Sequence, residues 1–331
     1  MIKQSDLALK LGVSRVTVTK ALQNSHDISR EMKAKVRKLA EELDYIPNLA
    51  ARNFSAKKTN TIGIVIPDIT NLYFSTIISG MMDVAEKECF NIILTASREK
   101  SKDERKNILN LLSLNVDGLL VCQSLDSVKP EIFERVKKRN KPIVFFGRPV
   151  GFSGFDSVGF DDHKAAVDLT EYLIKKGKTN IAHISGNLKS DGKFRLQGFL
   201  DTMKKHSLKV KKKWIIEGDY FPEFGYKGFN KIYNSGILPD ALFCGNDLIV
   251  EGVYEAARLK GIYIPNDISV AAIGHKKFAD LLYPKLTIID YPTKELGEET
   301  MKLIISRIKQ KTLKNNNVIL QTKLIENDSV I

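Results

Sequence analysis

The side chains with the clearest chemical potential lie near the N-terminus, within residues 14–24. Arg15 carries a forked guanidinium group that can donate two hydrogen bonds to O6 and N7 of guanine, whereas Val16 can make only apolar contact, for instance with a thymine methyl group. Polar side chains that suit contacts to phosphate oxygens surround them, namely Thr17, Thr19, Gln23 and Asn24. Because Thr19 and Lys20 also fall on the outward side with Arg15, the stretch is typical of a surface that reads the major groove of DNA.

Two helices joined by a tight turn are needed to present these side chains, and residues 4–23 fit such a helix-turn-helix. Ala8 is small enough for a helix crossing, and Gly12 can adopt the positive φ that the turn requires. Ser14 can cap the second helix, over residues 15–24. Apolar residues occupy the positions expected to be buried, Leu7, Leu11, Val13, Val18 and Ala21. A third helix is expected to follow, with its cap and core stripe formed by Ser29, Met32, Val36, Leu39, Ala40 and Leu43. An ordinary helical hairpin is the alternative.

The charge distribution favours a polyanionic partner for this first segment. The chain has 331 residues and a formal net charge of +13. Residues 1–60 contain 12 Lys and Arg against 6 Asp and Glu, so a sixth of the chain carries nearly half of the excess. Lysine clusters elsewhere, such as 211–213, are interpreted as solvated surface charge.

Signatures of catalysis and of metal binding are missing from the sequence. No GxGxxG motif follows an apolar run, and neither a P-loop nor an HExxH motif occurs. The three cysteines are far apart and form no CxxC pair, which argues against a zinc site and a disulfide framework. We therefore expect that the protein is not an enzyme and that it binds neither a cofactor nor a metal ion. The absence of a long apolar run and of a secretory h-region predicts a cytoplasmic protein without membrane contact.

From Thr61 onwards, apolar β-branched runs alternate with amphipathic segments, which predicts parallel strands covered by helices on both faces. The expected strands are 62–66, 92–96, 118–122, 143–146, 181–185, 214–217, 241–244, 268–273 and 286–289. The helical patterns between them include 74–88, 164–176, 248–260 and 294–309. These strands are too many for one sheet of ordinary size. We therefore expect an α/β core of two doubly wound subdomains with a cleft between them.

Sequence motifs spread over the whole chain resemble the lactose-repressor/galactose-repressor family of bacterial transcription regulators. They are DLALKLGVS at 6–14, TVTK at 17–20, Ile28-Ser29, LDYIPN at 43–48, Ala51-Arg52, TNTIGIVIPDITN at 59–71, VDGL at 116–119, GRP at 147–149, RLQGF at 195–199, Asn246-Asp247, PNDISV at 265–270 and PKLT at 284–287. The resemblance implies a helix-turn-helix headpiece followed by a core similar to periplasmic binding proteins. The implied domains are 1–45 for the headpiece, 46–60 for a hinge, 61–160 with 291–322 for one core subdomain, and 161–290 with 323–331 for the other.

For the headpiece and hinge, the resemblance implies a homodimer that represses transcription on a pseudo-palindromic double-stranded operator. The resemblance also implies that the hinge forms a short helix on DNA and inserts a side chain into the minor groove. The family usually has leucine at that wedge, where this sequence has Phe54, which can also unstack a base step. The DNA-binding residues implied are Ser14, Arg15, Val16, Thr17, Thr19, Lys20, Gln23, Asn24, Ser29, Asn48, Ala51, Arg52 and Phe54.

For the core, the resemblance implies a small-molecule effector, such as a sugar, sugar acid or sugar phosphate, bound between the subdomains. The implied contacts are Ile69, Asn71, Tyr73, Phe74, Gln123, Arg148, Phe160, Asp161, Arg195, Tyr220, Asn246, Asp247 and His275. Members that bind neutral ligands commonly carry an acidic residue where this chain has Gly274. With Arg148, Arg195 and His275 nearby, we expect a pocket richer in cations than in anions, and hence an acidic ligand.

Other functions remain open at this stage. A transport-type solute-binding protein shares the core fold, but the helical headpiece argues against it. A regulator controlled by a partner protein, as in global catabolite control, would bring a phosphocarrier protein to the first core subdomain. The sequence does not determine which effector or operator the protein binds. It also leaves open whether the protein represses or activates transcription and whether it forms a dimer or a tetramer.

Overall fold

The computed structural model describes residues 2–22, 24–46, 58–126, 131–148, 154–310 and 316–331. The chain forms two compact units, residues 1–59 and 60–331. We call the first the headpiece and the second the core, and describe each separately. In neither unit is any described helix both long and apolar enough to cross a membrane.

The headpiece consists of α1 (Gln4–Leu11), α2 (Arg15–Leu22) and α3 (Arg30–Glu42). Gly12 ends α1 with a φ of 63°, as the turn requires. Leu7, Val18 and Ala21 are fully buried, and Val36 packs against them from α3. Leu11 and Val13 are partly buried on the same cluster. The helix-turn-helix predicted from spacing is therefore present, although α2 ends at Leu22 rather than at residue 24.

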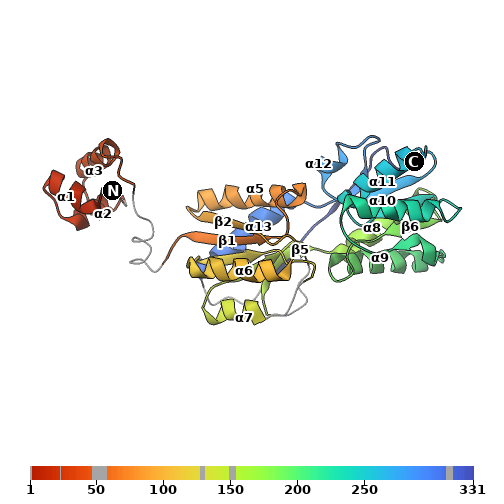
Figure 1. Ribbon diagram of the computed structural model, residues 1–331, viewed down its shortest axis with the longest axis horizontal. Helices are drawn as coiled ribbons and strands as arrows, with labels where there is room; N and C mark the ends of the chain where they lie inside the picture. The colour runs from red at the N-terminus through yellow and green to blue at the C-terminus, as the bar shows by residue number, and fades with distance from the viewer. Residues whose placement is uncertain (1, 23, 47–57, 127–130, 149–153, 311–315) are drawn as a thin grey trace. The chain divides into compact units, whose positions relative to one another are not determined.

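The first half of the core is built on a six-stranded sheet in which each strand pairs in parallel with its neighbours. The strand order is β11-β5-β4-β3-β1-β2, formed by β1 (Thr61–Ile66), β2 (Asn91–Ala96), β3 (Gly118–Val121), β4 (Ile143–Phe146), β5 (Asp156–Phe160) and β11 (Asn317–Leu320). Helices α5 (Leu72–Lys87) and α13 (Thr293–Lys309) cover one face, and α6 (Ser101–Ser113) and α7 (Glu131–Lys138) cover the other (Figure 1). We call this half the first lobe.

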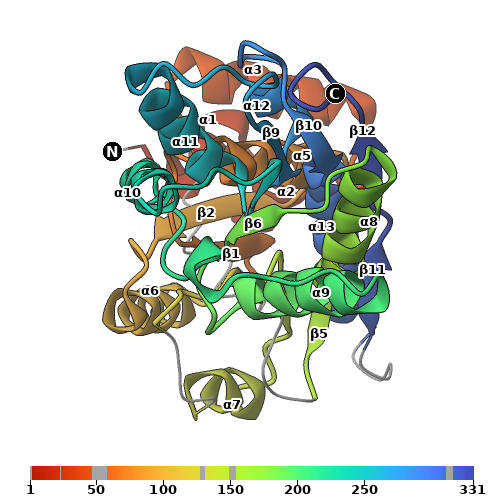
Figure 2. The same ribbon diagram turned by 90° about the vertical axis from the view of Figure 1, so that its right-hand side faces the viewer.

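The second lobe is built on a second six-stranded sheet, of order β12-β10-β9-β8-β6-β7, in which β12 alone runs antiparallel to its neighbour. Its strands are β6 (Ile181–Ile184), β7 (Ile215–Ile216), β8 (Ala241–Cys244), β9 (Ser269–Gly274), β10 (Thr287–Asp290) and β12 (Lys323–Ile325). Helices α10 (Pro222–Tyr233) and α11 (Asp247–Leu259) lie on one side of β6, and α8 (Asp162–Lys175) and α9 (Asp191–Lys205) pack together on its other face (Figure 2). The 3-10 turn at Lys212–Trp214 and α12 (Lys276–Ala279) complete the lobe.

The two lobes share one hydrophobic cluster, which runs from Ile64 in β1 through Phe160 and Tyr291 to Phe243 in β8. Phe160 and Tyr291 lie in the segments where the chain crosses between the sheets, and their rings stack with centroids 4.0 Å apart. The continuous core positions the strand ends of both sheets, from which the residues of the pocket extend.

Candidate functional site

Helix α2 presents Arg15 and Val16 to solvent. The helix begins at Ser14, whose Oγ accepts a hydrogen bond from the backbone N of Thr17 at 3.0 Å. Arg15 is exposed, and Val16 exposes 63% of its surface. Val18, on the opposite side of α2, is fully buried and fixes the helix against the headpiece core. The exposed pair is thus held on a rigid element and is free to meet a partner.

Thr19 and Lys20 make contacts within the headpiece. The Thr19 hydroxyl lies 2.9 Å from the backbone oxygen of Arg15 and 3.0 Å from Oε1 of Gln4. Lys20 Nζ forms an ion pair with Asp27 at 2.7 Å, and both side chains are partly exposed. A phosphate contact by Lys20 would therefore compete with Asp27.

The remaining predicted DNA-binding residues lie at helix ends or outside the described ranges. Asn24 follows α2 with a φ of 58°, and its Oδ1 accepts a hydrogen bond from Arg37 at 3.3 Å. Ser29 caps α3 by accepting a hydrogen bond from the backbone N of Met32 at 3.2 Å. The predicted DNA-binding residues that lie outside the described ranges are Gln23, Asn48, Ala51, Arg52 and Phe54.

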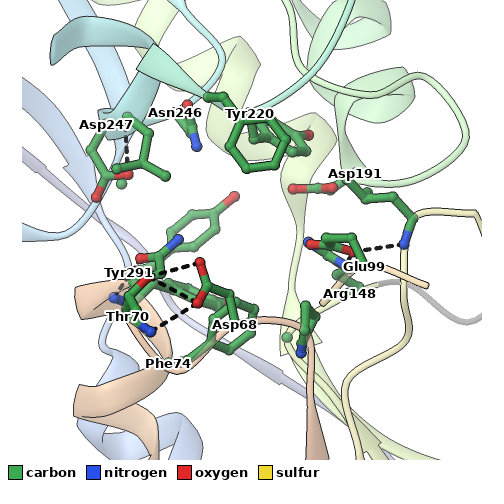
Figure 3. Close-up of a pocket in the computed structure, with 18 of the residues that line it drawn as sticks. Asp68, Thr70, Phe74, Glu99, Arg148, Asp191, Tyr220, Asn246, Asp247 and Tyr291 are labelled. Atoms are coloured by element: carbon green, nitrogen blue, oxygen red, sulfur yellow. Dashed lines mark hydrogen bonds and ion pairs between the residues drawn. The ribbon is translucent and has the colours of Figure 1, made fainter. Parts of the chain in front are cut away.

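A cavity of about 770 Å³ lies between the lobes (Figure 3). Its walls are the segments that follow the carboxyl ends of strands in both parallel sheets, which is where such sheets bind ligands. The volume falls within the range of about 300–1,000 Å³ that is typical of small-molecule sites. Of the predicted contacts, those that line it are Ile69, Asn71, Tyr73, Phe74, Arg148, Arg195, Tyr220, Asn246 and Asp247.

Two other predicted contacts support the wall from behind. The backbone oxygen of Gln123 accepts a hydrogen bond from Nη1 of Arg148. Phe160 is buried beneath Tyr291, which does line the cavity. These residues hold lining residues in place without lining the cavity themselves.

Asp161 and His275 lie apart from the lining. Asp161 is exposed and caps α8, accepting a hydrogen bond from the backbone N of Lys164 at 2.9 Å. His275 is buried at the start of α12. Burial, together with the nearby Lys277, lowers the pKa of His275, so the neutral ring is favoured.

Arg148 is already occupied by an acidic partner from its own lobe. Its Nη2 and Nη1 lie 2.7 Å and 3.0 Å from the two carboxylate oxygens of Glu99, which is a bidentate pair. Glu99 follows β2 with a φ of 58° and also accepts a hydrogen bond from the backbone N of Leu125 at 2.8 Å. This left-handed conformation of a non-glycine residue is costly, and it turns the carboxylate toward the arginine.

Arg195 is even more completely paired, as part of a buried cluster on the second lobe. Its Nε and Nη2 each lie 2.8 Å from Oδ1 of Asp162, and Nη2 lies 2.7 Å from Oδ2 of Asp191. Its Nη1 donates to the backbone oxygen of Gly245 at 2.6 Å. Burial opposes ionisation of Asp191, but Arg195 and Arg148 outweigh it and lower the pKa of its carboxyl. Arg195 therefore has no free pair of donors for a ligand carboxylate.

The prediction of a pocket richer in cations than in anions is wrong for the described lining. The lining includes four carboxylates and three guanidinium groups, from Asp68, Glu99, Asp191 and Asp247 and from Arg98, Arg148 and Arg195. Gly274 explains part of the error. A Cβ atom there would lie 3.0–3.1 Å from the side chain of Asp247, so the missing side chain makes room for a carboxylate from a neighbouring strand end.

Several lining residues were not predicted from the sequence, among them Arg98, Glu99, Asp191, Phe221 and Tyr291. Asp191 was detectable, because it precedes Arg195 by one helical turn and such pairs face each other. Glu99 and Tyr291 had no local signal, since their partners lie far away in the sequence. No group of three or more His, Cys, Asp and Glu side chains among the described residues is arranged to hold a metal ion.

Two family models match the chain. The one described as "Bacterial regulatory proteins, lacI family" matches residues 4–48. The one described as "Periplasmic binding proteins and sugar binding domain of LacI family" matches residues 59–328. Together they cover the headpiece and the core.

Individual proteins of similar sequence and fold agree with these matches. Catabolite control protein A of Priestia megaterium is 29% identical over 321 residues, covering 96% of each chain. The transcriptional repressor PurR of Serratia proteamaculans is 31% identical over 328 residues, covering 98% of this chain and 96% of the other. The crystal structure of the Lac repressor dimer bound to operator and an anti-inducer matches with a TM-score of 0.88 at 22% identity, covering 99% and 98%. On this sequence and fold evidence, the chain belongs to the lacI family of bacterial regulatory proteins and is a DNA-binding transcription regulator rather than an enzyme.

Proposed function

We propose that this protein is a homodimeric repressor in the cytoplasm that binds a pseudo-palindromic operator and responds to a small polar ligand held between its lobes. The observation that carries the DNA-binding part is the geometry of α2, where Arg15 and the apolar Val16 are exposed on a helix fixed by its buried side. Arg15 reads a guanine, and Val16 contacts a neighbouring thymine methyl group. The remaining polar residues of the headpiece contact phosphates and set the register.

Two-fold symmetry supplies the selectivity that one headpiece lacks. A single helix contacts few base pairs, and a dimer that reads two half-sites doubles the sequence it recognises. Residues 46–60 act as the hinge between headpiece and core, with Asn48, Ala51 and Arg52 on DNA and Phe54 as the minor-groove wedge. The chain segments 61–160 with 291–322 and 161–290 with 323–331 act as the two subdomains that move relative to each other.

The ligand-binding part rests on the cavity between the lobes. Its size, its aromatic walls and its buried polar groups suit a sugar-sized polar molecule. Arg148 and Arg195 serve as structural ion pairs rather than as acid-binding groups, so the ligand is bound through its hydrogen-bond donors. A cavity that is already formed and lined in this way favours control by a small ligand over control by a partner protein.

Operator binding is tested by fluorescence anisotropy with DNA selected by the protein itself from a random library. We expect tight binding that weakens steeply with salt, because phosphate contacts release counterions. Sedimentation velocity should give a dimer with and without operator. A monomer under both conditions at micromolar concentration would contradict the proposal.

A further inference from the structure

Asn60 is the residue through which the chain enters the core, and it closes the segment proposed as the hinge, residues 46–60. Its backbone N donates a hydrogen bond of 2.7 Å to Oδ2 of Asp117. Its backbone oxygen accepts a hydrogen bond of 2.7 Å from the backbone N of Asn91. Asp117 immediately precedes β3 and Asn91 begins β2, and these two strands flank β1. The entry to the core is therefore held from both sides.

The backbone of Asn60 adopts one specific conformation at this point. Its φ is 46°, in the left-handed region that most residues other than glycine avoid and that asparagine tolerates. This turn sets the direction in which the chain leaves β1 towards its N-terminus. The hydrogen bond to Asp117 stabilises the turn, because it binds the backbone N–H of the same residue.

Asp117 is itself held firmly in the first lobe. It is buried, and its backbone N donates a hydrogen bond of 2.7 Å to the backbone oxygen of Thr61. Its Oδ1 lies 4.0 Å from Nζ of Lys141, with which it forms an ion pair. A hydrogen bond to a carboxylate is about twice as strong as one between neutral groups. The carboxylate therefore attaches Asn60 to the lobe more firmly than strand pairing alone.

The second lobe contains the same arrangement at a place where no hinge is attached. Asp240 immediately precedes β8, which pairs with β6 as β3 pairs with β1. Its Oδ2 accepts hydrogen bonds from the backbone N of Thr179 and of Asn180, which precede β6, at 3.1 Å and 2.9 Å. The chain reaches β6 from α8 and not from the hinge. Both carboxylates thus hold the entry to a strand, but only Asp117 holds an entry that leads to the headpiece.

We propose that Asp117 is a positioning residue for operator binding, which fixes the point and the direction in which the hinge leaves the core. This assignment rests on the proposed function, in which residues 46–60 are the hinge. A hinge that starts from a fixed point loses less conformational freedom when it becomes ordered on DNA. In a dimer, two such exits must also be correctly spaced for both headpieces to reach their half-sites. Any movement of the first lobe is then transmitted to the hinge through Asp117.

The proposal is tested by removing the acceptor at each of the two equivalent positions. Asp117→Ala and Asp240→Ala each delete a carboxylate that holds the entry to a strand, and both are expected to lower the stability of the core in urea. Fluorescence anisotropy with the full-length protein and the selected operator compares their DNA binding where both are folded, as judged by circular dichroism. We expect Asp117→Ala to raise the dissociation constant at least about fivefold and Asp240→Ala to leave it within about twofold of the wild type.

Hydrogen exchange measured by mass spectrometry gives a readout that a general loss of stability does not produce. Peptides that contain Asn60 should exchange faster in Asp117→Ala than in the wild type and be unchanged in Asp240→Ala. Peptides that contain Asn180 should show the reverse. Unchanged exchange at Asn60 in Asp117→Ala would overturn the proposal.

The binding results also separate this inference from the proposed function. A loss of operator affinity below about fivefold in Asp117→Ala, or a loss of similar size in Asp240→Ala, would reject the role of Asp117 while the wild type still binds. A wild type that binds no selected operator would reject the proposed function, and this inference with it.

A milder pair of variants serves if Asp117→Ala does not fold. Asp117→Asn keeps an oxygen acceptor but loses the charge that strengthens the bond to Asn60 and pairs with Lys141, and Asp240→Asn is its control. We expect Asp117→Asn to weaken operator binding at least about threefold relative to Asp240→Asn. A smaller difference between the two folded variants would contradict the proposal.

Discussion

The hydroxyl of Tyr291 donates a hydrogen bond of 2.6 Å to Oδ1 of Asp162. Tyr291 follows β10 and Asp162 begins α8, so the bond joins two of the segments in which the chain crosses between the lobes. Asp162 in turn binds Arg195, which binds Asp191 in the cavity wall. A continuous set of polar contacts therefore connects the cavity to the crossover segments, and a ligand that binds Asp191 can act on both.

We predict that Tyr291→Phe destabilises the core. The variant keeps the ring that stacks on Phe160 but leaves the buried Asp162 without one of its donors. Hydrogen bonds to charged groups contribute about 1.5–3 kcal/mol, so the free energy of unfolding in urea should fall by that amount. The control is Tyr283→Phe, because Tyr283 is 95% exposed and its hydroxyl should contribute nothing measurable. Equal stability of the two variants would contradict the structural role of Tyr291.

We predict that Asp247→Asn changes the pH dependence of stability. Burial raises the pKa of Asp247 from 3.8 to about 6. The unfolded chain therefore releases this proton at lower pH than the folded chain, and the folded protein loses stability as the pH rises from 4 to 6. At pH 7 the variant should be more stable than the wild type by up to about 3 kcal/mol, and the difference should vanish near pH 4.

A control with the opposite sign is available on α9. The pKa of Asp201 is lowered by its hydrogen bonds to His163 and Gln197, which are formed by the ionised carboxylate. Asp201→Asn should therefore slightly reduce stability at neutral pH, and the difference should shrink as the pH falls. Urea unfolding of both variants across about pH 2–7 measures the two trends, because the contribution of Asp201 is lost only as the pH falls below its usual pKa of 3.8. If the stability difference from the wild type changed with pH in the same direction for both variants, burial of Asp247 would not set the pH dependence.

We predict that Gly186→Ala distorts the ligand cavity. The added methyl group would lie 1.6 Å from Cε1 of Tyr220, so the ring must move. Overpacking of this kind costs about 1–3 kcal/mol, to be measured by urea unfolding, and ligand affinity should fall with it. Gly159→Ala is the matched control, since a Cβ there meets nothing within 4 Å. Similar effects of the two substitutions would exclude a specific clash with Tyr220.

We predict that Arg15→Ala relaxes base preference at one position of each half-site. Loss of a bidentate guanine contact should cost about 1–3 kcal/mol on the preferred sequence and little on the others. Lys20→Ala is the comparison, and should weaken binding to all sequences by a similar factor, because a phosphate contact from Lys20 would carry no sequence information. Binding-site selection with each variant measures the difference. Unchanged preference in the Arg15 variant would contradict its assignment as a base-reading residue.

The strands formed by uninterrupted apolar runs could be predicted from the sequence, including β2 and β7 at the sheet edges, while β5, β11 and β12 could not. Residues 143–146 and 241–244 are uninterrupted apolar runs, and both form strands with the predicted bounds. Strand β5 was missed because it contains Asp156 and Gly159 and so lacks an apolar run. Asp156 is stabilised there by Arg307 from α13 and by the backbone N of Asn316, which donate to it at 2.7 Å each and lie 151 and 160 residues away.

The same limit applies to the cavity. The family motif located Arg148 and Arg195 in its wall, but their electrostatic role depends on partners that the motif does not contain. Glu99 lies 49 residues before Arg148, and Asp162 lies 33 residues before Arg195. Counting the charged residues near the predicted pocket therefore gave an excess of cations, whereas the lining has an excess of carboxylates. The prediction failed because long-range pairing decides which charges remain available to a ligand.

The central claim, that the protein reads a specific operator through α2, is tested most directly by selection from a random DNA library with the full-length wild-type protein at about 0.15 M salt. We predict enrichment of an inverted repeat, with a guanine at the same position of both half-sites. Recovered DNA that shows no sequence preference over the starting library would contradict it.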